Sequence, residues 1–367
     1  MALSPQYGWS EPDNSSLVKN GAADIRTLGD AIDTSLWNSG FGQAGKNKII
    51  NGDFSVNQRS FTTANTDASF GFDRWALRLS GATGTYTAET FALGTAPVSG
   101  YEGKNFAKLV VTTGNDLCRL EQRIEDVRTF AGQTVTLSFW AKGTNPTTAG
   151  NLAADLTQFF GTTGSPSAEV TLPQQTFVLT ANWTRYSLTF AVPSISGKTL
   201  GTDNISSLRV RIGQGTSVSA NGWTLDLWGV QLEYGAKMTP FQTASGGSPQ
   251  AELAMCQRYY FRITPSGAGR RYGMGFATDT SNASIWVQFP VTMRIQPTAL
   301  EQTGTATDYS LNVAGSNVTC SSVPTHAIGM PEAAVVTFTA ALGLISGNGA
   351  GARANATSAY LGWSAEL

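Results

Sequence analysis

The sequence predicts a mainly β protein, and three observations support this. Apolar residues alternate with polar ones in Tyr186–Val192 and in Leu208–Ile212, so one face of each segment is apolar. Glycine- and asparagine-rich turns separate such runs, and glycine alone supplies 40 of the 367 residues. One amphipathic helix, near the N-terminus, is the exception. This pattern is typical of antiparallel sandwiches and jelly rolls, not of βαβ units.

The chain divides into four segments along its length. Residues 1–45 comprise an irregular arm and a short helix, and residues 46–244 a jelly-roll β-sandwich with large loops. The small and turn-forming residues of 245–249 predict a linker. Residues 250–367 then form a second, smaller β-sandwich.

Composition excludes several classes of protein. Only 13% of residues are charged, about half the usual share, and the net charge is -1, which argues against a nucleic-acid-binding protein. We find neither a secretory leader nor an apolar run long enough to span a membrane, so we expect synthesis in a cytoplasm and no membrane insertion. Cys118, Cys256 and Cys320 are widely spaced and odd in number, which predicts neither a disulfide scaffold nor a zinc site.

The sequence gives little support for catalysis. The single histidine, His326, stands in SSVPTHAIG, which we interpret as a loop flanked by proline and glycine, and we expect it to be a surface loop residue. No nucleophile, metalloprotease or phosphate-binding motif occurs in a suitable context. A pair of carboxylates, as in glycosidases, stays open as an alternative, but we expect a protein that is not an enzyme.

Tryptophans are the candidates for ligand binding. Aromatic faces stack on the C–H faces of sugars, and Trp75, Trp140 and Trp228 are the candidates for such contacts. The alternative is that each fills a sandwich core. Trp140 is the strongest candidate, because its strand presents Val135 and Leu137 to the opposite face.

Five segments carry a resemblance to a known family. In order, they read NKIINGDFSVNQR, FGFDRWAL, VTLSFWAKG, WTRYSLTFAVPS and WTLDLWGVQLEYGAKMTPFQ. They are similar to the jelly-roll, carbohydrate-binding-module-like domain of tail fibre and receptor-binding proteins of tailed bacteriophages. ELAMCQRYYFRI, VQFPVTMRIQPT and AYLGWSAEL resemble the small β-domain that often follows in those proteins. The opening, YGWSEPDNSSLVKNGAADIRTLGDAID, resembles the virion-attachment start of phage appendage proteins.

The predicted helix spans Gly21–Trp37 and has one apolar stripe, at spacings of three and four residues: Ile25, Leu28, Ile32 and Leu36. A helix of this length is marginal alone in water. Because fibre proteins of the resembled family are typically trimers, we expect three chains to bury this stripe against one another. The alternative is that the helix packs on its own β region.

The arm before the helix carries two aromatic residues, Tyr7 and Trp9. The resemblance implies that they anchor the protein to the virion, at a tail, baseplate or head component. Disorder of these residues until a partner binds is the alternative.

The resemblance also implies a structural calcium ion, since in jelly-roll carbohydrate modules calcium often ties the first strand to the last. Asp53, Asp226 and Glu233 are the candidate ligands, because calcium prefers oxygen ligands. Solvated or turn-capping carboxylates are the alternative. We expect no other cofactor.

Taken with the residues, the resemblance predicts a virion protein, namely a homotrimeric tail fibre that binds host-surface polysaccharide. Two alternatives stay open. One is a purely structural adaptor or head-decoration fibre, and the other is a polysaccharide depolymerase.

Overall fold

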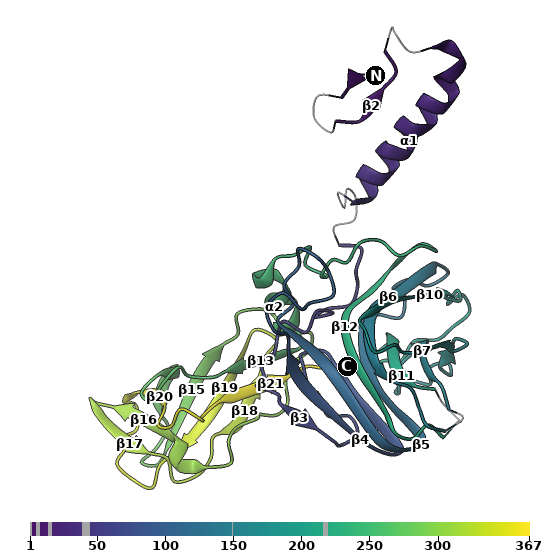
Figure 1. Ribbon diagram of the computed structural model, residues 1–367. Coiled ribbons are helices and arrows are strands. Elements are labelled where there is room, and N and C mark those ends of the chain that lie inside the picture. The colour runs from purple at the N-terminus through teal and green to yellow at the C-terminus, as the bar shows by residue number, and fades with distance from the viewer. Residues whose placement is uncertain (1, 5–7, 14–16, 39–44, 149, 216–218) are drawn as a thin grey trace.

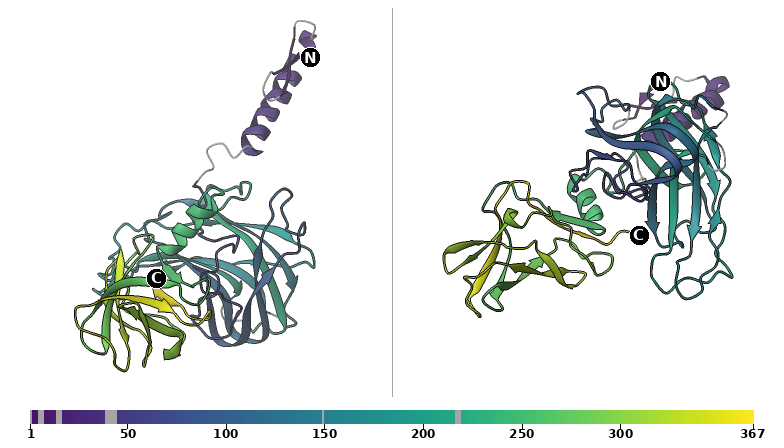
Figure 2. Two further views of the ribbon diagram at one scale, coloured as in Figure 1. Left: turned by 90° about the vertical axis from the view of Figure 1, so that its left-hand side faces the viewer. Right: turned by 90° about the horizontal axis from the view of Figure 1, so that it is seen from below.

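The computed structural model describes residues 2–4, 8–13, 17–38, 45–148, 150–215 and 219–367. Within these residues the protein is mainly β (Figure 1). A helix and a short hairpin lie at the N-terminus, a curled sheet forms the largest part, and a smaller sheet follows at the C-terminal end (Figures 1 and 2).

The N-terminal helix is confirmed. Strands β1 (Ala2–Leu3) and β2 (Ser10–Glu11) pair as a hairpin, and a 3-10 turn, η1 (Val18–Asn20), leads into α1 (Gly21–Asn38). The indole Nε1 of Trp9 donates a hydrogen bond to Ser35 Oγ of α1 at 2.8 Å. The hairpin therefore folds back along the helix.

The larger β region is one hydrogen-bonded network bent into two layers. Strand β5 (Asn105–Glu125) pairs with β12 (Trp223–Tyr234) through its first half and with β11 (Ser207–Gln214) through its second half. The strand order is β10-β6-β12-β5-β11-β7-β8, and β4 runs beside β5 over nearly its whole length. The remaining strands of this region are β3 (Thr63–Ala64), β4 (Ala76–Thr90), β6 (Thr134–Thr144), β7 (Leu152–Phe159), β8 (Val170–Thr171), β9 (Gln175–Phe177) and β10 (Thr184–Ala191).

One apolar core fills the space between the two layers. Val135, Leu137 and Phe139 of β6 are fully buried in it, as are Leu225 and Leu227 of β12. These residues are alternate members of their strands, so the other members point away from the core. The predicted jelly-roll β-sandwich is thereby confirmed.

The C-terminal part begins with a helix that the sequence analysis did not predict. Ser248 caps α2 (Pro249–Gln257) by accepting a hydrogen bond from Ala251 N, and a proline occupies the first turn. Glu252 of α2 is buried, where it accepts hydrogen bonds from the main-chain nitrogens of Asn51 and Ser245. Residues 245–249 thus form a turn and a helix cap held against the larger β region.

A seven-stranded antiparallel sheet follows, in the order β17-β16-β20-β14-β15-β19-β18, with a two-stranded ribbon of β13 and β21 beside it. Its own apolar core includes Trp363, Phe338 and Ile285. The elements are β13 (Tyr260–Ile263), β14 (Arg271–Ala277), β15 (Asn282–Gln288), η2 (Ala306–Asp308), β16 (Tyr309–Val313), β17 (Ser316–Thr319), β18 (Thr325–Gly329), β19 (Ala333–Thr339), β20 (Gly349–Ala354) and β21 (Leu361–Ser364).

Among the residues described, no helix has both the length and the apolar composition needed to cross a membrane.

Candidate functional site

Three parallel rows of side chains cross the outer surface of the larger sandwich, on strands β6, β12, β5 and β4. The central row consists of Lys142, Asp226, Lys108 and Thr87, which are direct cross-strand neighbours. They point outward because the residues beside them in sequence, such as Leu225 and Leu227, are buried in the core. We call this surface the lysine row face.

The two lysines share one carboxylate. Lys142 Nζ lies 3.7 Å from Asp226 Oδ2, and Lys108 Nζ lies 3.9 Å from Asp226 Oδ1. Both distances exceed an ordinary direct hydrogen bond, so each ammonium retains N–H donors for another acceptor. About a third of each lysine side chain is exposed. Burial raises the pKa of Asp226, although Lys108 and Lys142 oppose that rise.

An aromatic edge borders the central row on one side. Phe106 of β5 and Trp183, just before β10, are both partly exposed, and their rings meet edge to face at 5.4 Å. Lys142 Nζ lies 5.1 Å from the centre of the Trp183 ring, a cation–π contact. Thr144 and Thr224, which face each other across strands, border the opposite side with their hydroxyls.

This combination of groups suits the chemistry of sugars. Ammonium groups and hydroxyls donate to sugar oxygens, a carboxylate accepts from sugar hydroxyls, and a partly exposed indole offers an apolar surface to C–H faces. Apart from Trp183, which directly precedes β10, the groups lie on strands, so their spacing is fixed by strand register.

Two of the three predicted ligand-binding tryptophans are core residues instead. Trp75 and Trp228 have no exposed surface. Trp75 donates from Nε1 to the Asn51 carbonyl oxygen at 3.0 Å, and Trp228 is enclosed by the rings of Tyr101 and Phe241, among others. Other segments of the chain cover them, which is why strand alternation did not reveal their burial.

Trp140 lies on the outer face, as expected, but it is largely covered. Its ring contacts Trp228 at 5.6 Å and Phe241 at 6.0 Å, and the Arg185 guanidinium lies 4.4 Å above it. A bulge in β12 brings Gly229 against the indole, at a positive φ and so close that a Cβ there would lie 2.8 Å from the ring. Trp140 therefore packs beneath the face rather than serving as an open platform.

The candidate calcium ligands are held apart and already engaged. Asp53 accepts hydrogen bonds from the Tyr101 hydroxyl at 2.8 Å and from Ser55. Glu233, fully buried, accepts from Thr239 N at 2.8 Å, and Asp226 lies between its two lysines. Within the described part of the chain, no three histidine, cysteine or acidic residues are grouped as a metal site. These carboxylates do not fit a shared calcium ion.

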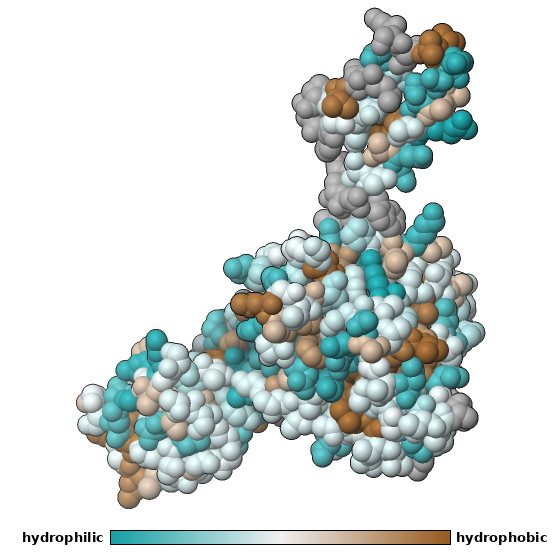
Figure 3. Space-filling model, in the orientation of Figure 1, coloured by the Kyte–Doolittle hydropathy of each residue, from teal (hydrophilic) through white to brown (hydrophobic). Residues whose placement is uncertain are grey.

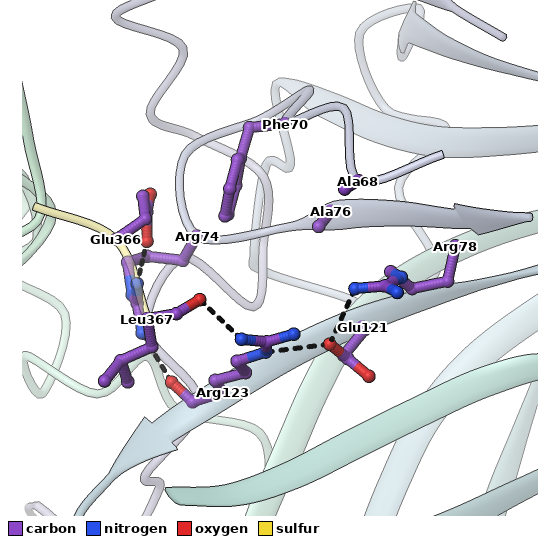
Figure 4. Close-up of a pocket in the computed structure, with 9 residues that line it drawn as sticks. All are labelled: Ala68, Phe70, Arg74, Ala76, Arg78, Glu121, Arg123, Glu366 and Leu367. Atoms are coloured by element: carbon purple, nitrogen blue, oxygen red, sulfur yellow. Dashed lines mark hydrogen bonds and ion pairs between the residues drawn. The ribbon is translucent and has the colours of Figure 1, made fainter. Parts of the chain in front are cut away.

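A pocket of about 170 Å³ lies where the C-terminal tail meets the larger sandwich (Figure 4). Arg123 donates to Glu121 at 2.9 Å and to the Leu367 main-chain oxygen at 2.7 Å, and Arg74 pairs with Glu366. Burial alone raises the pKa of Glu121, but the neighbouring arginines outweigh it and hold that pKa below its usual value. Two of these contacts, Arg123 with Leu367 and Arg74 with Glu366, link the larger sandwich to the C-terminal tail. We therefore interpret the pocket as part of the joint between the two β regions.

The predicted trimerisation and attachment residues are only partly described. Ile25 is 65% exposed, while Leu28 and Ile32 are half-buried in the single chain. Leu36 belongs to α1, but its side chain lies outside the described residues, as does the whole of Tyr7. Trp9 is half-buried against the helix. The trimer and the attachment role stay predictions.

His326 lies in strand β18 and not in a loop, and it is partly buried. Burial lowers its pKa. Of the carboxyl groups, Asp73 has its pKa raised mainly by burial, but it is fully enclosed and accepts hydrogen bonds from Gln58, so it is not placed to protonate a substrate.

Sequence reasoning missed Trp183, Lys108 and Lys142. A signal for the first was available, since Trp183 opens the WTRYSLTFAVPS segment, just before a strong strand. The lysines gave no signal of their own, because their meeting at Asp226 depends on the order of β6, β12 and β5 in the sheet.

Comparison with known proteins yields weak likenesses only. Neither a protein-family model nor a curated protein matches the chain. Among solved structures, the chain is similar to the enzymatically active domain of bacteriophage CBA120 tailspike protein 4, with 16% identity over 52% of this chain and 21% of that one, at a TM-score of 0.31. It thus spans about a fifth of that tailspike structure.

Two further likenesses cover nearly the whole of the other chain. A putative sugar binding protein from Bacteroides thetaiotaomicron is 14% identical over 52% of this chain and 100% of its own, at a TM-score of 0.32. The CBM22-2 xylan-binding domain of Paenibacillus barcinonensis Xyn10C is 16% identical over 47% and 98%, at a TM-score of 0.29. Scores this low carry no functional argument.

Proposed function

We propose that this protein is a non-catalytic, homotrimeric tail fibre of a tailed bacteriophage, which binds host-surface glycans through the lysine row face. One observation carries the glycan-binding part. Lys142, Asp226 and Lys108 form a partly exposed row between an aromatic edge and a line of hydroxyls, fixed on adjacent strands. The virion role and the trimer are supported by the sequence resemblance and by the exposed Ile25 in the apolar stripe of α1.

The expected ligand is an extended polysaccharide. The face is a sheet surface, so a chain of sugars can lie across several strands and meet Lys142, Asp226 and Lys108 in turn. Single contacts of this kind are weak, and three copies in a trimer multiply them through avidity. This suits adsorption to a cell surface that repeats the same glycan many times.

The test is binding of the full-length protein to a printed array of bacterial surface polysaccharides. We compare Trp183→Ala and Lys142→Ala with a matched control, Lys237→Ala, which changes an exposed lysine of a turn outside the row. The first two variants should lose at least tenfold in apparent affinity while their melting temperatures stay near that of the wild type. The control should bind normally.

Two results would contradict the proposal. One is wild-type protein that binds no polysaccharide on the array. The other is equal binding by all three variants, which would place any glycan site elsewhere. Release of sugar fragments from a bound polysaccharide would instead support the depolymerase alternative.

A further inference from the structure

The outer surface of the C-terminal sheet carries exposed apolar side chains that the proposed glycan site does not use. Met274, Trp286 and Val335 are direct neighbours across β14, β15 and β19. They point outward, because the residues next to them in sequence, such as Ile285 and Val336, are fully buried in the C-terminal core. Figure 3 shows apolar side chains, in brown, at the tip of the C-terminal region.

Trp286 is held as an open aromatic surface. Its side chain is 46% exposed, and that of Met274 beside it is 69% exposed. The only polar atom of the indole, Nε1, donates a hydrogen bond to Gln288 Oε1 at 3.3 Å. Gln288 Nε2 in turn donates to the Glu332 carbonyl oxygen at 2.9 Å. An anchored amide therefore fixes the indole while part of the ring stays in contact with solvent, as at a ligand site where apolar surface is rimmed by polar groups.

Two arginines give the same surface a positive charge. Arg271 and Arg353 are direct cross-strand neighbours on β14 and β20. The Arg271 guanidinium lies over Gly351, the cross-strand neighbour of Met274, where a Cβ would overlap it. We call the surface from Arg271 to Trp286 the arginine–tryptophan face.

These arginines have donors to spare. Arg271 donates from Nη2 to Asn312 Oδ1 at 3.3 Å, and Arg353 Nε is buried without a hydrogen-bond partner. In the described part of the chain, no carboxylate forms an ion pair with either arginine. Like charges directly across two strands destabilise a sheet, and a bound anion would relieve this repulsion. Because a guanidinium binds a carboxylate through two parallel hydrogen bonds, the face favours a ligand with a carboxylate.

The charged and apolar parts of the face are spaced for two linked sugar rings. The Arg271 guanidinium lies over β20 and Trp286 stands on β15, with β14 between these strands. At the usual strand spacing they are about 10 Å apart, which is the span of a disaccharide. Ser284 and Thr337, direct neighbours across β15 and β19, line the next row with hydroxyls. These hydroxyls can hydrogen-bond a sugar whose C–H face lies on the indole.

We infer that the arginine–tryptophan face is a second saccharide site, specific for an acidic sugar. The sugar carboxylate pairs with Arg271, and the C–H face of the adjoining ring stacks on Trp286. The inference goes beyond the proposed function, because it uses none of the residues of the lysine row face and does not need the trimer. It places a carboxylate-selective contact on the C-terminal region.

The first experiment measures binding of the full-length protein to polygalacturonate, alginate and polysialic acid. Each is compared with its carboxyl-reduced form, in which CH2OH replaces the carboxylate. The wild type should bind at least one acidic form at least tenfold more tightly than the reduced form. Arg271→Gln and Trp286→Ala should each lose at least tenfold in affinity for that acidic form, with melting temperatures near that of the wild type. Arg128→Gln is the matched control, since it removes a 62% exposed arginine of the larger β region, and should bind normally.

The second experiment locates the ligand on the face. The three native cysteines are buried and do not compete for a maleimide reagent. A saturating concentration of the bound acidic polysaccharide should slow maleimide labelling of Met274→Cys at least tenfold. Labelling of Leu93→Cys, at a 94% exposed position of the larger β region, should be unchanged.

The outcomes separate this inference from the proposed function. A wild type that binds none of the acidic forms, or that binds acidic and reduced forms equally, overturns the inference, and so does unprotected Met274→Cys. Loss of acidic binding in Lys142→Ala but not in Arg271→Gln assigns the acidic sugar to the lysine row face and also overturns it. Acidic binding that survives Lys142→Ala and is lost in Arg271→Gln supports the inference, even where the bacterial array contradicts the proposed function.

Discussion

Arg258 of the C-terminal region donates two parallel hydrogen bonds to the Glu125 carboxylate of the larger sandwich, from Nη2 at 2.8 Å and from Nε at 3.0 Å. The Tyr259 hydroxyl donates to the same carboxylate at 2.8 Å. Arg74–Glu366 and Arg294, which donates to the Asn204 carbonyl oxygen at 2.9 Å, continue this polar joint. The two β regions are therefore connected by charge-assisted hydrogen bonds rather than by a shared apolar core.

The joint should weaken in acid. Burial raises the pKa of Glu125, but the hydrogen bonds from Arg258 and Tyr259 outweigh it and leave that pKa below its usual value of about 4.3. A lowered pKa in the folded state stabilises the protein above the unfolded pKa, and this contribution is lost as pH falls through the folded pKa. The Arg258 side chain is 42% exposed and that of Glu125 34%, so we expect about 1 kcal/mol or less.

The measurement is the melting temperature of the wild type and of Glu125→Gln between pH 7 and pH 3. The wild type should be the more stable at pH 7, and the difference should shrink below pH 4. A difference that is constant across this range would show that ionisation of Glu125 does not support the joint.

Trp140 gives a test of the covered outer face. Replacing it with alanine removes contacts with Trp228, Phe241 and Arg185, so Trp140→Ala should cost about 2–4 kcal/mol of unfolding free energy. Trp286→Ala is the control, since that indole is half exposed, and should cost under about 1 kcal/mol. Urea unfolding measures both. Similar small values for the two variants would mean that Trp140 is not part of the packed structure.

Much of the fold could be predicted from local sequence. The strand over Thr184–Ala191 buries Leu188 and Phe190 as its alternation indicates, and α1 begins at the predicted Gly21. Signals for α2 were also present, in the capping Ser248 and the proline after it, but the glycines before them favoured a linker.

The covered faces could not be predicted in this way. Alternation separates Thr136 and Ser138 from the core face of β6, yet both are fully buried. Residues near the end of β12 cover them, since Thr136 donates to the Gly235 carbonyl oxygen and Arg185 bridges Ser138 and Thr239. The burial of Thr136 and Ser138 depends on contacts between residues up to about a hundred positions apart in sequence. Strand periodicity, which is a local pattern, does not predict such contacts.

The cysteines should be inert in the folded protein. Burial raises the pKa of Cys118 and that of Cys320 to about 12, and raises the pKa of Cys256 well above its usual value. Because the thiolate is the reactive form, a disulfide reagent at pH 8 should titrate close to zero thiols per native chain and three per chain in urea. Rapid native reaction of one thiol would reveal local opening around it.

Helix α1 provides the last prediction, on the proposed trimer. Ile25 is 65% exposed in the single chain although it belongs to the apolar stripe, whereas Leu28 and Ile32 are already half-buried. An aspartate at position 25 would bury a charge at the centre of a three-helix contact, so Ile25→Asp should weaken assembly at least tenfold.

Ala23→Asp is the matched control, because residue 23 is exposed and lies about 200° around the helix from residue 25. Light scattering at micromolar concentration reads the mass of each variant. Equal masses for wild type, Ile25→Asp and Ala23→Asp would show that the helix packs on its own chain and that the stripe plays no part in assembly.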